Sequence, residues 1–188
     1  MPSLVLAPDQ SAIQTAMRAF LLAVLPDGTE VFEGLDNRVP EPSNANFVTM
    51  TTLRRPRLAT NQDTLNEDGD AIAMEQSTEI VIQLDVHSDD TSRASDNAQI
   101  ISTTFRDGYA TEFFSDYPGI SPLYADEPRL VPFQNAESQY EPRYVVEAHL
   151  QADQVVTVPA QSTDSVSLDI NNVETDPASW PNSTVTVP

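Results

Sequence analysis

Apolar residues recur at helical spacing close to the start of the chain. Within residues 9–25, one face of the predicted helix carries Ile13, Met17, Phe20, Leu21 and Val24. This spacing predicts an amphipathic helix with one buried side. Asp9 or Ser11 can cap its first turn, and Pro26-Asp27-Gly28 ends it and turns the chain.

A second helical pattern covers residues 89–114. Its buried stripe is predicted to consist of Ala94, Ala98, Ile101 and Phe105. Asp89, Asp90 or Thr91 is the expected N-cap. Acidic residues near the start of a helix interact favourably with the helix dipole. Gly108 is expected to loosen the last turns of this single long helix.

Alternation of apolar and polar residues marks two strands. Residues 77–88 direct Ile80, Ile82, Leu84 and Val86 to one side and Glu79, Val81, Gln83, Asp85 and His87 to the other. Residues 139–159 direct Tyr144, Val146, Ala148 and Leu150 to one side and Val145, Glu147 and His149 to the other. A period of two is typical of strands with one face on a core. We predict that the two strands pair antiparallel.

The remaining segments complete an α+β fold. Residues 45–58 alternate with Phe47 and Thr49 on one side, and Pro56 must bulge the strand, end it or place it at an edge. Short strands are predicted at 29–35, 129–135 and 164–174, loops at 36–44 and 115–128, and a long flexible hairpin arm or loop at 60–75. The predicted architecture is an antiparallel (mixed) β-sheet with two α-helices packed on one face. Residues 1–172 form the single domain and residues 173–188 an extended tail.

Composition and charge narrow the class of protein. The chain has 188 residues, 29 acidic residues against nine basic ones, and a net charge of -20. Such a surface is unsuited to general nucleic-acid binding, which depends on Lys and Arg. The absence of Cys excludes disulfides and thiol catalysis. No apolar run approaches the roughly 20 residues of a membrane span, and the N-terminus lacks a secretory signal pattern, so we expect no membrane partner.

Two acid–histidine pairs are candidates for a metal site. Asp85 and His87 lie on one side of their strand, and Glu147 and His149 lie on one side of theirs. If the strands are neighbours, two imidazoles and two carboxylates can converge, which is a set that binds metals. The alternative is that both pairs lie on a solvent or interface face, where such neighbours are common.

A calcium loop is a weaker candidate. Asn66, Asp68, Gly69 and Glu75 nearly fit the ligand spacing, but Thr64 replaces the first Asp. A solvated acidic loop explains the segment equally well. No nucleophile–base motif or phosphate-binding loop is present in the sequence.

Three of the nine basic residues, which are all Arg, lie in "LRRPRL": Arg54, Arg55 and Arg57. Three interpretations compete. The guanidinium groups can contact DNA phosphates, pair with carboxylates of a neighbouring subunit, or discourage unwanted pairing at a strand edge.

Three stretches taken together resemble a phage family. They are "LRRPRLATNQDT", "IVIQLDVHSDDTSRASDNAQIISTTFRDGYATEFF" and "ISPLYADEPRLVPFQNAESQYEPRYVVEAHLQADQVVTVP". In order and pattern they are similar to the neck or tail terminator proteins of tailed bacteriophages and prophages, over about residues 10–170. None of these stretches is a catalytic signature.

The resemblance implies a tail-terminator-like structural virion protein, and no catalytic residue, cofactor or metal. Such a subunit forms a ring with copies of itself, usually a hexamer, at the head-proximal end of the tail. The ring stops growth of the tail tube, meets the head–tail connector, and lets DNA pass through its lumen. Assembly is expected in the host cytoplasm. The rival functions are a small metal-dependent enzyme using Asp85, His87, Glu147 and His149, and a non-viral acidic binding module.

Overall fold

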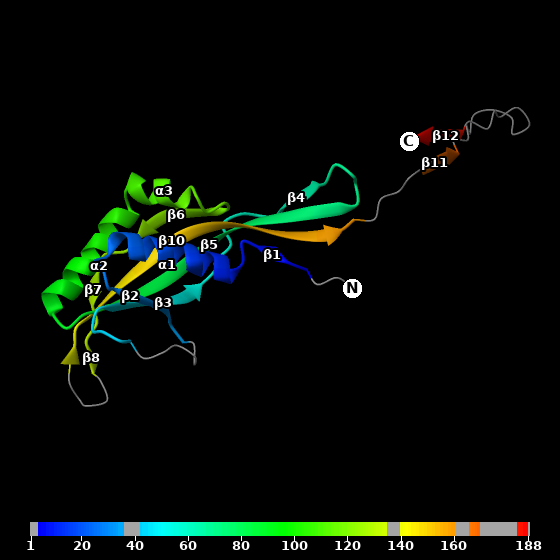
Figure 1. Cartoon of the computed structure of the whole chain (residues 1–188). Helices are drawn as coiled ribbons and strands as arrows, with labels where there is room; N and C mark the ends of the chain where they lie inside the picture. Colours follow the sequence, from blue (N-terminus) through cyan, green and yellow to red (C-terminus); the bar gives the residue numbers. More distant parts are fainter. Residues whose placement is uncertain (1–3, 36–41, 135–139, 161–165, 170–183, 188) are drawn as a thin grey trace, which may run out of the picture.

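Two long antiparallel strands form the centre of the structure (Figure 1). The structure is a computed structural model, and it describes residues 4–35, 42–134, 140–160, 166–169 and 184–187. Strand β5 (Ala71–His87) pairs with β10 (Arg143–Pro159) along the full 17 residues of each, from Arg143 opposite His87 to Pro159 opposite Ala71. The predicted antiparallel pairing is confirmed, and β5 begins six residues earlier than the alternation indicated.

Six shorter strands flank this pair within the described part of the chain, and together they form one eight-stranded mixed sheet. On the β5 side lie β3 (Phe47–Arg54), β4 (Gln62–Leu65) and β2 (Glu30–Glu33), the last parallel to β3. On the β10 side lie β1 (Leu6–Ala7), β6 (Ile120–Ala125) and β7 (Arg129–Leu130).

The structure overturns one expectation about an irregular segment and decides between the two alternatives of another. The loop predicted at 115–128 is wrong, because β6 within it pairs with residues 148–152 of β10. The arm predicted at 60–75 is a hairpin of β4 and the first part of β5. Two small pairs lie outside the main sheet: β8 (Phe133–Gln134) with β9 (Tyr140–Glu141), and β11 (Val166–Asp169) with β12 (Thr184–Val187). Most of the predicted loop at 36–44 and of the predicted tail falls outside the described residues, and the division at residue 172 stays a prediction.

The helical layer has three helices where two were predicted. Helix α1 (Gln10–Val24) begins at the N-cap Asp9, whose carboxylate accepts a hydrogen bond from the Ala12 amide at 2.8 Å. The single helix predicted over 89–114 is instead α2 (Thr91–Phe105) and α3 (Gly108–Phe114). Asp107 breaks it, because its carboxylate accepts from the Tyr109 amide at 3.0 Å and caps a new helix. No helix in the described residues is long and apolar enough to cross a membrane.

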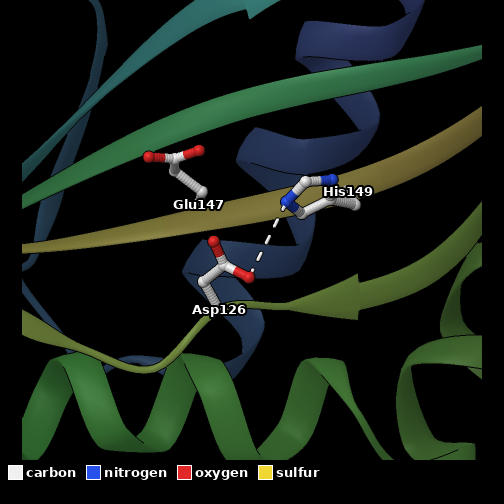
Figure 2. Close-up of side chains that lie close together, drawn as sticks. All are labelled: Asp126, Glu147 and His149. Carbon is white, nitrogen blue, oxygen red and sulfur yellow. Dashed lines mark ion pairs between the residues drawn. The ribbon is translucent and has the colours of Figure 1, made fainter.

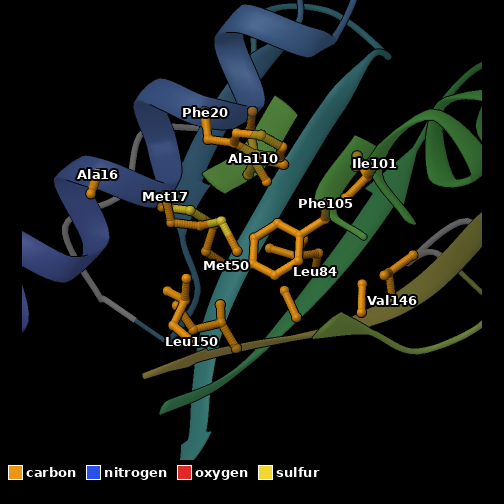
Figure 3. Close-up of a cluster of buried hydrophobic side chains, with 14 of the residues drawn as sticks. Ala16, Met17, Phe20, Met50, Leu84, Ile101, Phe105, Ala110, Val146 and Leu150 are labelled. Atoms are coloured by element: carbon orange, nitrogen blue, oxygen red, sulfur yellow. The ribbon is translucent and has the colours of Figure 1, made fainter. Parts of the chain in front are cut away.

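The core lies between the helices and one face of the sheet (Figure 3). The sheet contributes alternate residues such as Leu84, Val146 and Leu150, as the period of two predicted. Phe20 of α1 meets Phe105 of α2, with ring centroids 5.4 Å apart in an edge-to-face arrangement. All three helices thus cover the same face, and in the described part of the chain no helix lies on the opposite face, which we call the helix-free face.

Candidate functional site: the helix-free face of the sheet

The helix-free face gathers the polar residues that alternate with the core positions. Strand register places Glu147 opposite Gln83 and His149 opposite Val81. Across the next strand pairs, Arg54 lies opposite Val81 and Tyr124 lies opposite His149. One row across the sheet therefore runs through four strands, and both predicted acid–histidine pairs lie on this face.

The Asp85 carboxylate, at one end of the helix-free face, has hydrogen-bond partners and a cation within its own chain. Its side chain is nearly buried, and it accepts from Gln83 Nε2 at 2.9 Å and from Thr49 Oγ1 at 3.4 Å. The Arg143 guanidinium lies 3.7 Å away. A buried carboxylate with these partners is a structural group, since the hydrogen bonds and the nearby cation offset the cost of desolvating it.

His87 lies beside this network. Its ring stacks on Phe47 with centroids 4.3 Å apart and planes 8° from parallel. Burial lowers the pKa of His87, and the nearby Asp85 carboxylate opposes this shift only in part. His87 therefore favours its neutral form as a packed aromatic ring.

His149 lies on β10, two strands away from Arg54 of β3. Figure 2 shows it beside Asp126 and Glu147. Its side chain is 2 % exposed, and its Nδ1 lies 2.5 Å from Glu79 Oε1. Tyr124 stacks on the ring at a centroid distance of 4.0 Å. The other nitrogen, Nε2, lies 4.0 Å from Asp126 Oδ1 and has no hydrogen-bond partner among the described residues.

Asp126 is held against β10 by its backbone. Its amide donates to the Glu147 carbonyl at 2.8 Å. The Glu147 side chain in turn accepts from Arg129 Nη2 at 2.9 Å. The pKa of the Tyr124 hydroxyl is raised by partial burial and by the carboxylates of Glu79 and Asp126. Several acids thus meet around one buried imidazole.

The predicted set of Asp85, His87, Glu147 and His149 is wrong as a single cluster. In the described residues, the one group of three or more His, Asp or Glu ligand atoms within 4.8 Å of one another consists of Asp126, Glu147 and His149. The register separates the pairs, because His87 lies opposite Arg143 while His149 lies opposite Val81. Sequence reasoning missed Asp126 because it lies in the segment predicted as a loop. The segment gives no regular alternation that would have indicated a strand, because Leu123, Tyr124 and Ala125 are three consecutive apolar residues.

The local geometry also argues against the calcium-loop candidate. The Asn66 side chain serves the hairpin turn, because its Oδ1 accepts from the amides of Asp70 and Ala71, each at 3.0 Å. Glu75 lies within β5, opposite Gln62. Asn66 therefore lies at the turn of the hairpin and Glu75 lies within its paired strands. The ligands of a calcium loop would instead surround one ion.

The arginine segment lies where β3 ends. Arg54 is the last residue of β3, after a shift in register, and Arg57 forms an isolated bridge with Thr78. The backbone is fixed by a 2.9 Å hydrogen bond from the Glu79 amide to the Pro56 carbonyl. β3 ends at Arg54, two residues before Pro56, and a strand end is one of the three outcomes predicted for this proline. Arg54, Arg55 and Arg57 are all exposed.

None of these three arginines forms an ion pair with a described Asp or Glu of the same chain. By contrast, Arg93 on α2 pairs with Asp89 at 3.0 Å and Arg129 pairs with Glu147. The structure thus holds the backbone of the segment in place and leaves three guanidinium groups facing outward.

Comparison with known proteins identifies the family. No curated protein matches the chain. Among 11 matching chains of solved structures is the sheath/tube terminator of an extracellular contractile injection system, PVC, determined by cryo-electron microscopy in the extended state. The two chains are 11% identical with a TM-score of 0.44, and the match covers 92% of this chain and 65% of that one. This chain thus spans about 65% of the length of that neighbour.

The sequence gives a family match that covers most of the chain. The family model described as phage neck terminator protein matches residues 11–176. This range includes the two central strands, helices α2 and α3, all of α1 except its first residue, and the arginine segment. The resemblance seen in the sequence is confirmed, and the chain belongs to the phage neck terminator protein family.

Proposed function

We propose that this chain is the subunit of a ring, a hexamer, at the head-proximal end of a phage tail. The ring ends growth of the tail tube and joins the tail to the head–tail connector, and DNA passes through its lumen. It assembles in the host cytoplasm and remains in the virion. The observation that carries the proposal is the family match over residues 11–176. Two features of the fold support a role in contacts between subunits.

The first feature is the arm formed by the outer halves of β5 and β10, flanked by β4 and β1 (Figure 1). Its helix-side face continues the core pattern with Ile72 opposite Val158 and Met74 opposite Val156. These four apolar side chains are only partly buried by their own chain. A neighbouring subunit that covers this stripe would remove apolar area from water, which favours association.

The second feature is the arginine segment. A net charge of -20 per chain makes identical subunits repel one another unless specific contacts overcome the repulsion. Arg54, Arg55 and Arg57 offer outward cations on a fixed backbone to the carboxylates of a neighbour, and arginine pairs with carboxylates through two parallel hydrogen bonds. The acidic remainder suits a conduit through which DNA slides without binding.

The test is charge reversal of the segment, as the triple variant Arg54→Glu, Arg55→Glu, Arg57→Glu. The matched control is Arg93→Glu, which also reverses an exposed arginine but on α2. Mass measurement and electron microscopy are carried out with and without isolated tail tubes, because a subunit can stay monomeric until it meets the tube. We expect the triple variant to lose rings and the control to keep them.

An intact ring in the triple variant would reject the subunit-contact role of the segment. Retained rings combined with impaired DNA passage would assign the arginines to the lumen instead. If wild-type protein forms no closed ring in either condition, the ring proposal itself is wrong.

A further inference from the structure

We propose that Asp126, Glu147 and His149 form a binding site for a divalent cation of the zinc type. The site lies on the helix-free face, where the end of β6 meets β10 (Figure 2). One imidazole nitrogen and two carboxylates form a donor set that suits zinc and similar first-row ions. The family resemblance implies no such site, and the site lies within one chain, so its occupancy does not require ring assembly.

The state of His149 is the strongest support. Its Nδ1 lies 2.5 Å from the Glu79 carboxylate. When ionised, a carboxylate accepts hydrogen bonds and cannot donate one. In the neutral imidazole, this hydrogen bond places the proton on Nδ1 and leaves the lone pair of Nε2 for a metal. Nε2 is buried, has no hydrogen-bond partner among the described residues, and is directed at Asp126. A metal-binding histidine is commonly oriented in this way, with its second nitrogen bonded to a carboxylate.

The distances fit a cation better than a direct contact. His149 Nε2 and Asp126 Oδ1 are 4.0 Å apart, too far for a hydrogen bond. A zinc ion between them would make two bonds of about 2.0 Å, the usual length for zinc with nitrogen or oxygen. The ligand atoms of all three residues lie within 4.8 Å of one another. Tetrahedral bonds of about 2.0 Å place two ligand atoms about 3.3 Å apart. Binding therefore requires the Asp126 carboxylate, whose side chain is 49% exposed, to move toward His149.

The surrounding charges complete the arrangement. Glu79, Asp126 and Glu147 place three carboxylates around the imidazole, and Arg129 balances one of them through Glu147 Oε1 at 2.9 Å. The second oxygen of Glu147 is left to turn to the cation, while Arg129 and Glu79 hold the ligands from outside. A bound ion would pin Asp126, at the start of the β6–β7 connection, to β10, with water in the fourth position.

The experiment measures binding of Zn²⁺ to tag-free protein, because a histidine tag would itself bind zinc. Equilibrium dialysis in excess Mg²⁺ suppresses weak binding to the acidic surface. We expect one Zn²⁺ per chain. The variants Asp126→Asn and Glu147→Gln should each weaken affinity at least about tenfold. The controls Glu127→Gln, an exposed neighbouring acid, and His87→Gln, the other histidine, should bind as wild type does.

A second measurement does not depend on any variant. Nitrogen-15 NMR of the two histidine side chains should show that Zn²⁺ shifts the Nε2 resonance of His149 and leaves the His87 resonances in place. The absence of saturable uptake would overturn the site. Unchanged affinity in both Asp126→Asn and Glu147→Gln, or an equal loss in His87→Gln, would do the same. Circular dichroism of each variant verifies that it has folded.

Discussion

Phe20 is expected to hold the three helices together, and its removal should be costly. The side chain is fully buried, with the ring centroids of Phe105 and Phe113 at 5.4 Å and that of Phe114 at 5.5 Å. Truncating a buried Phe to Ala costs about 3–5 kcal/mol from lost transfer free energy and the cavity left behind. Three aromatic contacts place Phe20→Ala at the upper end, about 4–5 kcal/mol. Phe20→Leu keeps most of the volume and should cost about 1–2 kcal/mol.

The assay is urea unfolding followed by far-UV circular dichroism, at a protein concentration where the chain is monomeric. For a chain of this size, the loss in Phe20→Ala corresponds to a fall of about 10–15 °C in melting temperature. The control is Leu22→Ala on the same helix, because Leu22 is 43% exposed and should change stability by less than about 0.5 kcal/mol. A loss below about 1 kcal/mol in Phe20→Ala would refute the reasoning, since no well-packed aromatic cluster could then lie between the helices.

Three further outcomes are expected. Asp107→Ala removes the cap that starts α3 and should lower the free energy of unfolding by about 1 kcal/mol in urea titrations. Gly119→Ala should cost about 1–2 kcal/mol by the same measurement, because φ is +74° and the new Cβ would lie 3.2 Å from Pro8 Cδ and 3.3 Å from the Asp153 carbonyl. The free energy of unfolding should fall as the pH drops from about 6.5 through the folded-state pKa of His87, since burial lowers that pKa and the unfolded chain binds the proton more readily. His87→Gln should remove this part of the pH dependence, and an identical pH profile in that variant would contradict it.

The parts of the fold that were predicted correctly are those with a strong local period. The buried face of α1, the stripe of α2 and the alternation of β5 and β10 all follow from which side of an element meets the core. The end of β3 near Pro56 follows from a missing backbone donor. The break at Asp107 was missed because an aspartate in a helical pattern serves equally as a surface residue or as a new cap.

The candidate site was only half predictable. Glu147 and His149 were recognised as a pair because they lie two residues apart on one strand. Their partner Asp126 is 23 positions from His149, and only the pairing of β6 with β10 brings the two together. Asp85 and His87 were grouped with them because alternation assigns a face but gives no position along the strand.

The sequence alone determined which residues face the core, the α+β class, the acidic character of the surface and the resemblance to phage terminators. These properties depend on residue type and on spacing within one element, where backbone geometry is regular. Tertiary structure decided the register of β5 on β10, the strand nature of 120–125, and the meeting of Asp126 with His149. The physical reason is that register and strand pairing arise from contacts between distant segments, whose relative positions no local period encodes.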